Sequence, residues 1–258
     1  MRYQKKNVLI TGGATGLGQV IATSYAREGA KIAIIDFLDA SETVEKVQNE
    51  GQPAAAFKAD VRDQAAVQAA VEDAMAFFDG RIDVLVNNAG FNGHYNLIEN
   101  MPLTEWRETL DINLTGTMLV TQAVIPHMRA SGGGAIGITA SNVARRGLPY
   151  RADYVCSKWA LLGLNQTLAL ELVKDNIRVN AICPGPIEGH RIEDVISRQA
   201  AAEGKSPDVM RKLWEEAAPM NRFVTADEVT AAMMFLTSDA ASAMTGQAIN
   251  VTGGFLMT

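Results

Sequence analysis

The 258-residue sequence lacks the features of disulfide-rich, metal-binding and nucleic-acid-binding proteins. It has only two cysteines, Cys156 and Cys183, without CxxC spacing or a histidine partner pattern. We therefore expect reduced cytoplasmic thiols, no disulfide framework and no bound metal. The 23 basic and 29 acidic side chains give a net charge of −6, and no lysine or arginine cluster offsets it. Such a surface repels phosphate backbones, so we expect no nucleic-acid partner.

Long hydrophobic runs and linker-like segments are also missing. Near the N-terminus, the apolar stretch of residues 8–10 ends at glycines, which predicts neither a signal peptide nor a membrane span. No proline- or glycine-rich stretch divides the chain, and 48% of its residues are hydrophobic. These observations predict one domain over residues 1–258 and no membrane partner.

Short Val- and Ile-rich runs alternate with longer stretches of helical periodicity. This alternation predicts an α/β protein with a doubly wound, Rossmann-type fold: about seven parallel strands with helices on both faces. The predicted strands span residues 7–11, 31–36, 54–58, 82–86, 134–139, 177–182 and 248–251. The predicted helices span residues 17–28, 41–50, 64–78, 114–129, 153–174 and 226–236.

Residues 185–224 interrupt this rhythm with a polar segment that has two short helix patterns and no strand. Ligands of open α/β sheets bind beyond the strand ends, and this segment follows one. We therefore expect a substrate-covering loop at about 185–224, with a surface insertion as the alternative.

A glycine-rich turn joins the first predicted strand to the first helix. Its residues Gly12, Thr15, Gly16, Leu17 and Gly18 have the spacing G-x-x-x-G-x-G. Glycines let backbone N–H groups approach a pyrophosphate, and a helix N-terminus adds free donors and partial positive charge. The arrangement predicts a dinucleotide cofactor.

An acidic residue, Asp36, ends the second predicted strand and is followed by Phe37. A carboxylate there can accept hydrogen bonds from both adenosine ribose hydroxyls, and no nearby cation could receive the 2′-phosphate of NADP. The cofactor predicted is therefore NAD.

Two further strand ends are placed to touch this cofactor, although ordinary turn chemistry would also explain them. We expect Asp60 and Val61 at the adenine edge, and we expect Asn88, Ala89 and Gly90 beside the cofactor.

Tyr154 and Lys158 stand four residues apart at the start of a predicted helix, and therefore on one helical face. A phenol with its usual pKa of about 10 is a poor base at neutral pH. A nearby ammonium and a cationic nicotinamide would favour the phenolate, which suits Tyr154 to acid/base chemistry.

In order and spacing, these motifs resemble the short-chain dehydrogenase/reductase superfamily in its compact single-domain branch. The resemblance covers essentially the whole chain. Besides the residues above, it rests on TGGATGLG at 11–18, NNAG at 87–90, Asn113, Ser141, YVCSK at 154–158, Pro184-Gly185 and the terminal INVTGG.

The resemblance implies a catalytic set of Asn113, Ser141, Tyr154 and Lys158. Tyr154 would exchange the proton with the substrate oxygen, and Ser141 would orient that oxygen. Lys158 would lower the tyrosine pKa and hold the nicotinamide ribose. Asn113 would anchor a relay water through its backbone.

The resemblance also places Pro184, Gly185 and Ile187 at the cofactor, with the Ile187 backbone receiving the carboxamide. Gly189 stands where the family often carries threonine, which puts the closure of that loop in question. Compact members form homotetramers or dimers, so we expect a homo-oligomer.

These features together predict an NAD-dependent oxidoreductase that interconverts a small-molecule secondary alcohol and its ketone, with a polyol, sugar derivative or anion as substrate. Arg151, His190 and Arg191 fall near the predicted pocket and could read an anionic group, or could instead pair with surface acids. Alternatives are a 3-oxoacyl-carrier reductase and, in a different class, a non-catalytic nucleotide-sensing binding protein.

Overall fold

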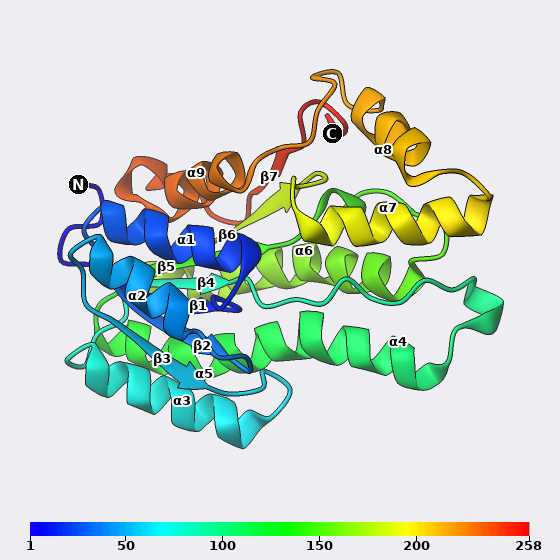
Figure 1. The fold of residues 1–258 in the computed structure, drawn as a ribbon. Coiled ribbons are helices and arrows are strands. Elements are labelled where there is room, and N and C mark those ends of the chain that lie inside the picture. Colours follow the sequence, from blue (N-terminus) through cyan, green and yellow to red (C-terminus); the bar gives the residue numbers. More distant parts are fainter. Residues whose placement is uncertain (258) are drawn as a thin grey trace.

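A seven-stranded parallel sheet forms the centre of the computed structural model, which describes residues 1–257 (Figure 1). The strand order is β3-β2-β1-β4-β5-β6-β7, so the order reverses between β1 and β4. The predicted α/β doubly wound, Rossmann-type fold is confirmed. The strands are β1 (Asn7–Thr11), β2 (Lys31–Asp36), β3 (Ala54–Lys58), β4 (Val84–Asn87), β5 (Gly134–Thr139), β6 (Ile177–Pro184) and β7 (Ala248–Val251).

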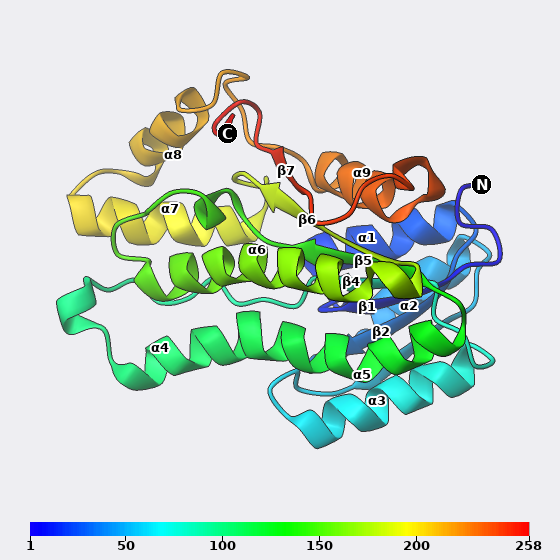
Figure 2. The same cartoon turned by 180° about the vertical axis from the view of Figure 1, so that it is seen from behind.

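Helices cover both faces of this sheet (Figures 1 and 2). On one face lie α1 (Gly16–Arg27), α2 (Ser41–Asn49) and α9 (Ala226–Thr237). On the other lie α3 (Gln64–Phe77), α5 (Gly116–Ala130) and α6 (Ala152–Leu172), with α4 (Leu103–Leu110) packed on α6.

Each face of the sheet has its own hydrophobic core, because successive strand side chains point to opposite sides. In β1, Leu9 packs with α3 and α5, whereas Val8 and Ile10 pack with α1 and α9. Strands buried on both faces read as continuous apolar runs, which is why the sequence showed them clearly.

The structure corrects several predicted elements, and β6, for example, ends at Pro184 instead of residue 182. β4 begins at Val84 instead of residue 82, because its register with β5 starts at the pair Val84 and Ala135. The sequence reading omitted α4, a short helix after Pro102 in which Thr109 is the buried residue. The helix predicted from residue 114 begins at Gly116, since the preceding residues 111–115 form a π-helical turn.

Residues 185–224 contain two helices, as the sequence indicated, and they lie beyond the carboxyl ends of the strands (Figure 1). These are α7 (His190–Glu203) and α8 (Pro207–Glu216). They share a small core of Ile192, Ile196, Ala200, Met210 and Phe223, separate from the two main cores. Among the described residues, no helix has the length and apolarity needed to cross a membrane.

Candidate active site

The glycine-rich turn is held against the end of β4. Gly12 has a φ of +67°, and a Cβ there would lie 2.6 Å from the Cα of Ala89. A Cβ on Gly18 would lie 1.9 Å from the Gly12 carbonyl oxygen, to which the Asn88 side chain donates at 3.0 Å. The Thr11 hydroxyl accepts hydrogen bonds from the backbone N–H groups of Asn88 and Ala89. Only residues without a Cβ permit this close approach at positions 12 and 18.

The N-terminus of α1 follows this turn. Thr15 has extended backbone geometry and makes no side-chain cap, so its hydroxyl does not satisfy the first N–H groups of the helix. Gly16 and Leu17, the first two helical residues, line a cavity. Free donors and the helix dipole at that point fit the pyrophosphate of a dinucleotide.

Asp36 lies at the end of β2, next to the turn. Its carboxylate accepts hydrogen bonds from the N–H of Ala14 at 2.8 Å and of Leu38 at 3.0 Å. The Asp36 side chain is buried, whereas the neighbouring Phe37 ring is 61% exposed. A negative charge fixed by two backbone donors fits ribose hydroxyls and disfavours a phosphate.

Asp60 and Val61 follow the carboxyl end of β3, at the same edge of the sheet as Asp36. Asp60 forms an ion pair with Arg62 at 2.5 Å, and that hydrogen bond lowers the pKa of the Asp60 carboxyl. Val61 is buried beneath α5, where a Cβ on Gly116 would lie 2.6 Å from its side chain. Val61 therefore packs under this end of the sheet, and Asp60 already has a cationic partner.

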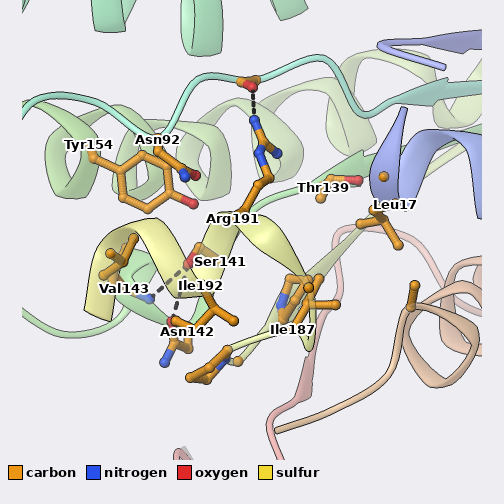
Figure 3. Close-up of a pocket in the computed structure, with 18 of the residues that line it drawn as sticks. Leu17, Asn92, Thr139, Ser141, Asn142, Val143, Tyr154, Ile187, Arg191 and Ile192 are labelled. Atoms are coloured by element: carbon orange, nitrogen blue, oxygen red, sulfur yellow. Dashed lines mark hydrogen bonds between the residues drawn. The ribbon is translucent and has the colours of Figure 1, made fainter. Parts of the chain in front are cut away.

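A cavity of about 400 Å³ opens beside the glycine turn and extends beneath α7 (Figure 3). It brings together thirteen of the residues singled out from the sequence. These are Gly16, Leu17, Asn88, Gly90, Ser141, Arg151, Tyr154, Lys158, Pro184, Gly185, Ile187, His190 and Arg191. Of the other singled-out residues, Gly12, Gly18 and Ala89 shape the turn, and Asn113 lies behind the cavity wall.

Three members of the predicted catalytic set, Ser141, Tyr154 and Lys158, line this cavity. In Figure 3 the ring of Tyr154 lies close to Asn92, and its hydroxyl faces the space between Ser141 and Arg191. The Lys158 ammonium lies 5.7 Å from the centre of the Tyr154 ring and donates to the Thr139 carbonyl at 2.9 Å.

The surroundings of Tyr154 favour its ionised form. Burial alone raises the pKa of the phenol, but the positive charges of Lys158 and Arg151 and a hydrogen bond with Ser141 outweigh it. The Tyr154 pKa therefore lies below its usual value of 10.0. Burial lowers the pKa of Lys158. Both shifts bring the pair closer to the range in which proton transfer at neutral pH is efficient.

Asn113 lies in the π-helical turn between α4 and α5, a type of irregularity that often occurs at functional sites. Its side-chain amide exchanges two hydrogen bonds with the Phe91 backbone, at 2.7 and 3.0 Å, and donates to the Ser157 hydroxyl at 2.9 Å. Its carbonyl accepts from Thr117 at 2.8 Å. Asn113 thus ties the loop after β4 to α6, and its side chain is fully used in doing so.

The three residues proposed to read an anion all border the cavity. Arg151 is buried, and its guanidinium lies 4.8 Å from the centre of the Tyr154 ring. Arg191 reaches across from α7 and donates to the Gly90 carbonyl at 2.5 Å, while His190 is exposed.

The sequence left open that Arg151 and Arg191 pair with acidic side chains at the surface, and the described residues do not show such pairs. Glu188 and Glu193 instead form ion pairs with Arg211. Asp153 accepts hydrogen bonds from the backbone of His94 and Tyr154 and from the Thr109 hydroxyl. Among residues 1–257, Arg151 and Arg191 form no ion pair.

Several further cavity residues were not identified from the sequence. Asn92 and Asn142 flank Tyr154 and Ser141, and Trp214 reaches the cavity from α8. Asn142 had one available signal, because it directly follows Ser141. Trp214 stands in a segment whose position depends on tertiary packing, so nothing in its local pattern pointed to the site.

Comparisons with known proteins agree with this geometry. The family model described as enoyl-(acyl carrier protein) reductase matches residues 12–256. D-threitol dehydrogenase of Mycolicibacterium smegmatis is 39% identical, covering 98% of this chain and 94% of the relative. A 3-oxoacyl-(acyl-carrier-protein) reductase of Thermotoga maritima is 34% identical over 100% of both chains. The crystal structure of NAD+-bound xylitol dehydrogenase superposes with a TM-score of 0.94 at 33% identity, covering 98% of this chain and 100% of that chain.

Proposed function

Because this chain belongs to the short-chain dehydrogenase/reductase superfamily, we propose that it interconverts a secondary alcohol of a polyol or sugar derivative and the corresponding ketone, with NAD as cofactor. The observation that carries this proposal is the placement of Tyr154, Ser141 and Lys158 in one cavity beside the glycine turn, with the Lys158 ammonium 5.7 Å from the centre of the Tyr154 ring. The lowered pKa of Tyr154 agrees with this proposal. The polyol substrates in the names of two similar proteins favour a polyhydroxylated substrate.

The residues around the turn would hold NAD at its adenosine and pyrophosphate parts. The α1 N-terminus at Gly16 and Leu17 would receive the pyrophosphate, and Asp36 would accept from the ribose hydroxyls. Ile187 and Lys158 would border the nicotinamide half. NAD, when bound, supplies the acceptor for the hydride.

The protein residues would handle the proton. During alcohol oxidation, the Tyr154 phenolate takes the hydroxyl proton of the substrate while Ser141 holds the same oxygen by a hydrogen bond. Lys158 and Arg151 stabilise the negative charge on Tyr154 before transfer. Asn113 holds the first turns of α6 in place through its hydrogen bond to Ser157. Its backbone would anchor the relay water, as the family resemblance implies.

We propose that residues 185–224 cover the substrate. Ile187, Arg191 and Trp214 of this segment all border the cavity. Arg211 links the cover internally through ion pairs with three glutamates, two of them Glu188 and Glu193. Exclusion of water by such a cover strengthens the electrostatic interactions inside.

We further propose a cytoplasmic homo-oligomer. Both cysteines are free, which suits a reducing compartment. On α6, Trp159 is 52% exposed and Leu170 is 80% exposed, and large apolar side chains on one helix surface suit contact with a second copy.

The test is to present purified protein with NAD or NADP and a panel of secondary alcohols that includes threitol and xylitol, and to follow NADH formation by absorbance. A 3-oxoacyl thioester with NADH and with NADPH belongs in the same panel, because one similar protein is a reductase of that class. We expect NAD reduction by at least one polyhydroxylated alcohol. Tight NADH binding with no turnover of any compound would favour the nucleotide-sensing alternative, and no NADH binding would contradict the proposal.

A further inference from the structure

The reactive end of the cavity contains more positive charge than the proposed chemistry requires. The cations of Lys158, Arg151 and Arg191 all act on the Tyr154 phenol. Lys158 and Arg151 have a role in the proposed reaction, since their charges favour the Tyr154 phenolate. Arg191 has none, and one ammonium beside the phenol would already serve that purpose. The protein carries a net charge of −6, so this local excess of cations is opposite in sign to the molecule as a whole.

Arg151 is held rigidly at the wall of this cavity. Its side chain is 5% exposed, and one of its terminal N–H groups donates to the Asn92 carbonyl. The rings of Tyr95 and Tyr150 stack at 4.8 Å, and the Asn96 N–H donates to the Tyr150 carbonyl at 3.0 Å. These contacts fix the loop before α6, so the guanidinium position is set before any ligand arrives.

The Arg151 guanidinium is incompletely paired within residues 1–257. Its Nε–H is buried and has no hydrogen-bond partner, and no carboxylate forms an ion pair with the side chain. Burial lowers the pKa of Arg151, which reflects the cost of placing its charge there. A buried cationic donor without a partner is unfavourable unless a ligand completes its hydrogen bonds.

The cavity has little negative charge of its own to offset these cations. Of the lining residues within 1–257, Glu188 is the one acid, and its carboxylate is bound to Arg211 at 2.7 Å. Nicotinamide in its oxidised form would add a further positive charge. With a neutral polyol, the Tyr154 phenolate and the nearby Asp153 carboxylate alone would offset these positive charges, whereas an anionic group on the substrate would balance the remainder.

We propose, on the basis of the function proposed above, that the substrate is a polyhydroxy acid, and that Arg151 binds its carboxylate. The planar guanidinium can donate from Nε and a terminal nitrogen to the two carboxylate oxygens at once. It lies over the ring of Tyr154, so a short carbon chain separates the carboxylate from the carbon that reacts at the Tyr154 hydroxyl. That carbon loses its hydrogen as hydride to NAD and its hydroxyl proton to Tyr154, and the carboxylate is unchanged.

The proposal is tested with matched pairs of ligands, threitol with threonate and xylitol with xylonate. Calorimetry measures the binding of each compound to the enzyme loaded with NADH, and NADH formation is measured separately for each compound with NAD. The variants are Arg151→Gln, which removes the charge, and Arg151→Lys, which keeps the charge without the fork. Arg129→Gln is the matched control, because Arg129 pairs with Asp175 at the exposed end of α5, outside the cavity.

In the wild type and in Arg129→Gln, we expect the acid of each pair to bind about 10- to 100-fold more tightly than the polyol, as one charged hydrogen-bonded contact provides. Arg151→Gln should abolish this preference while it retains NADH binding, and Arg151→Lys should keep only part of it. If Arg151→Gln does not fold, the wild-type preference and its partial loss in Arg151→Lys decide the question.

Equal binding of acid and polyol in the wild type would overturn the proposal, and so would an unchanged preference in Arg151→Gln. In either case, NAD reduction by a polyol would leave the proposed function intact. Absence of NADH binding would instead refute the proposed function, and the polyhydroxy acid assignment with it.

Discussion

Replacement of Asp36 by asparagine tests why this protein should select NAD over NADP. The Asp36 carboxylate is fixed by the N–H groups of Ala14 and Leu38, at 2.8 and 3.0 Å. Asparagine retains the shape and one acceptor oxygen but removes the negative charge. The change should therefore affect cofactor discrimination much more than the fold.

The magnitude follows from the charge on a 2′-phosphate. Two unit charges about 4 Å apart repel by about 4 kcal/mol at an effective dielectric constant of about 20. Since each 1.4 kcal/mol is about a tenfold change in affinity, the wild type should prefer NADH over NADPH by about 1000-fold. In Asp36→Asn this repulsion is absent, so the preference should largely disappear, with weaker NADH binding because one ribose hydrogen bond is lost.

Titration with NADH and NADPH measures these affinities without knowledge of the substrate. The protein has three tryptophans, and Trp214 lines the cavity, so energy transfer from tryptophan to the reduced cofactor provides the signal. Asp36→Glu is a useful control, because it keeps the charge and displaces it by one methylene. Comparable wild-type affinities for the two cofactors, or an unchanged ratio in Asp36→Asn, would refute the role given to this carboxylate.

Three further predictions concern the proton chemistry, the cover and the core. Because the positive charge of Lys158 lowers the pKa of Tyr154, the phenolate forms at lower pH. Lys158→Met should therefore move the rising limb of the oxidation pH profile to higher pH, which steady-state kinetics measured over a range of pH will show. Arg211 holds residues 185–224 together by exposed ion pairs, which salt screens. The wild-type substrate KM should therefore rise with potassium chloride concentration, whereas KM of Arg211→Gln should be higher at low salt and nearly independent of salt. Thr237 lies 2.6 Å from the buried Tyr25 hydroxyl, so Thr237→Val should lower the free energy of unfolding in urea by about 1–3 kcal/mol without changing kcat, and Tyr25→Phe in that background should recover part of the loss.

The inner strands were predictable because a strand buried on both faces leaves a continuous apolar run in the sequence, and the partly buried edge strands β3 and β7 were found from their short apolar runs. Five of the seven strands, β1, β2, β3, β5 and β7, have the predicted bounds. α4 was missed because it is short and mostly exposed, as Leu103 at 59% illustrates, so its pattern gave no apolar face. The π-helical turn was missed because its geometry depends on Asn113 bonding to a distant loop.

The site was predictable where it depends on strand ends. The carboxyl ends of parallel strands meet at one edge of a sheet, and the structure brings the glycine turn, Asn88 and Ser141 to one cavity there. The contacts of Arg151 were not predictable. Its position over Tyr154 depends on a stacked tyrosine pair and a backbone bridge between two loops, which local sequence does not encode.

The central claim, that Tyr154 is the proton-transfer group of an NAD-dependent dehydrogenase, is tested most directly by Tyr154→Phe. The variant removes one oxygen and keeps the ring, whose centre lies 4.8 Å from the Arg151 guanidinium and 5.7 Å from the Lys158 ammonium. With the best alcohol found in the panel, we expect kcat to fall by about 100- to 10,000-fold, as the loss of a positioned acid/base group implies, while NADH affinity is unchanged. Retention of near wild-type kcat in Tyr154→Phe, with the same cofactor affinity, would contradict the account.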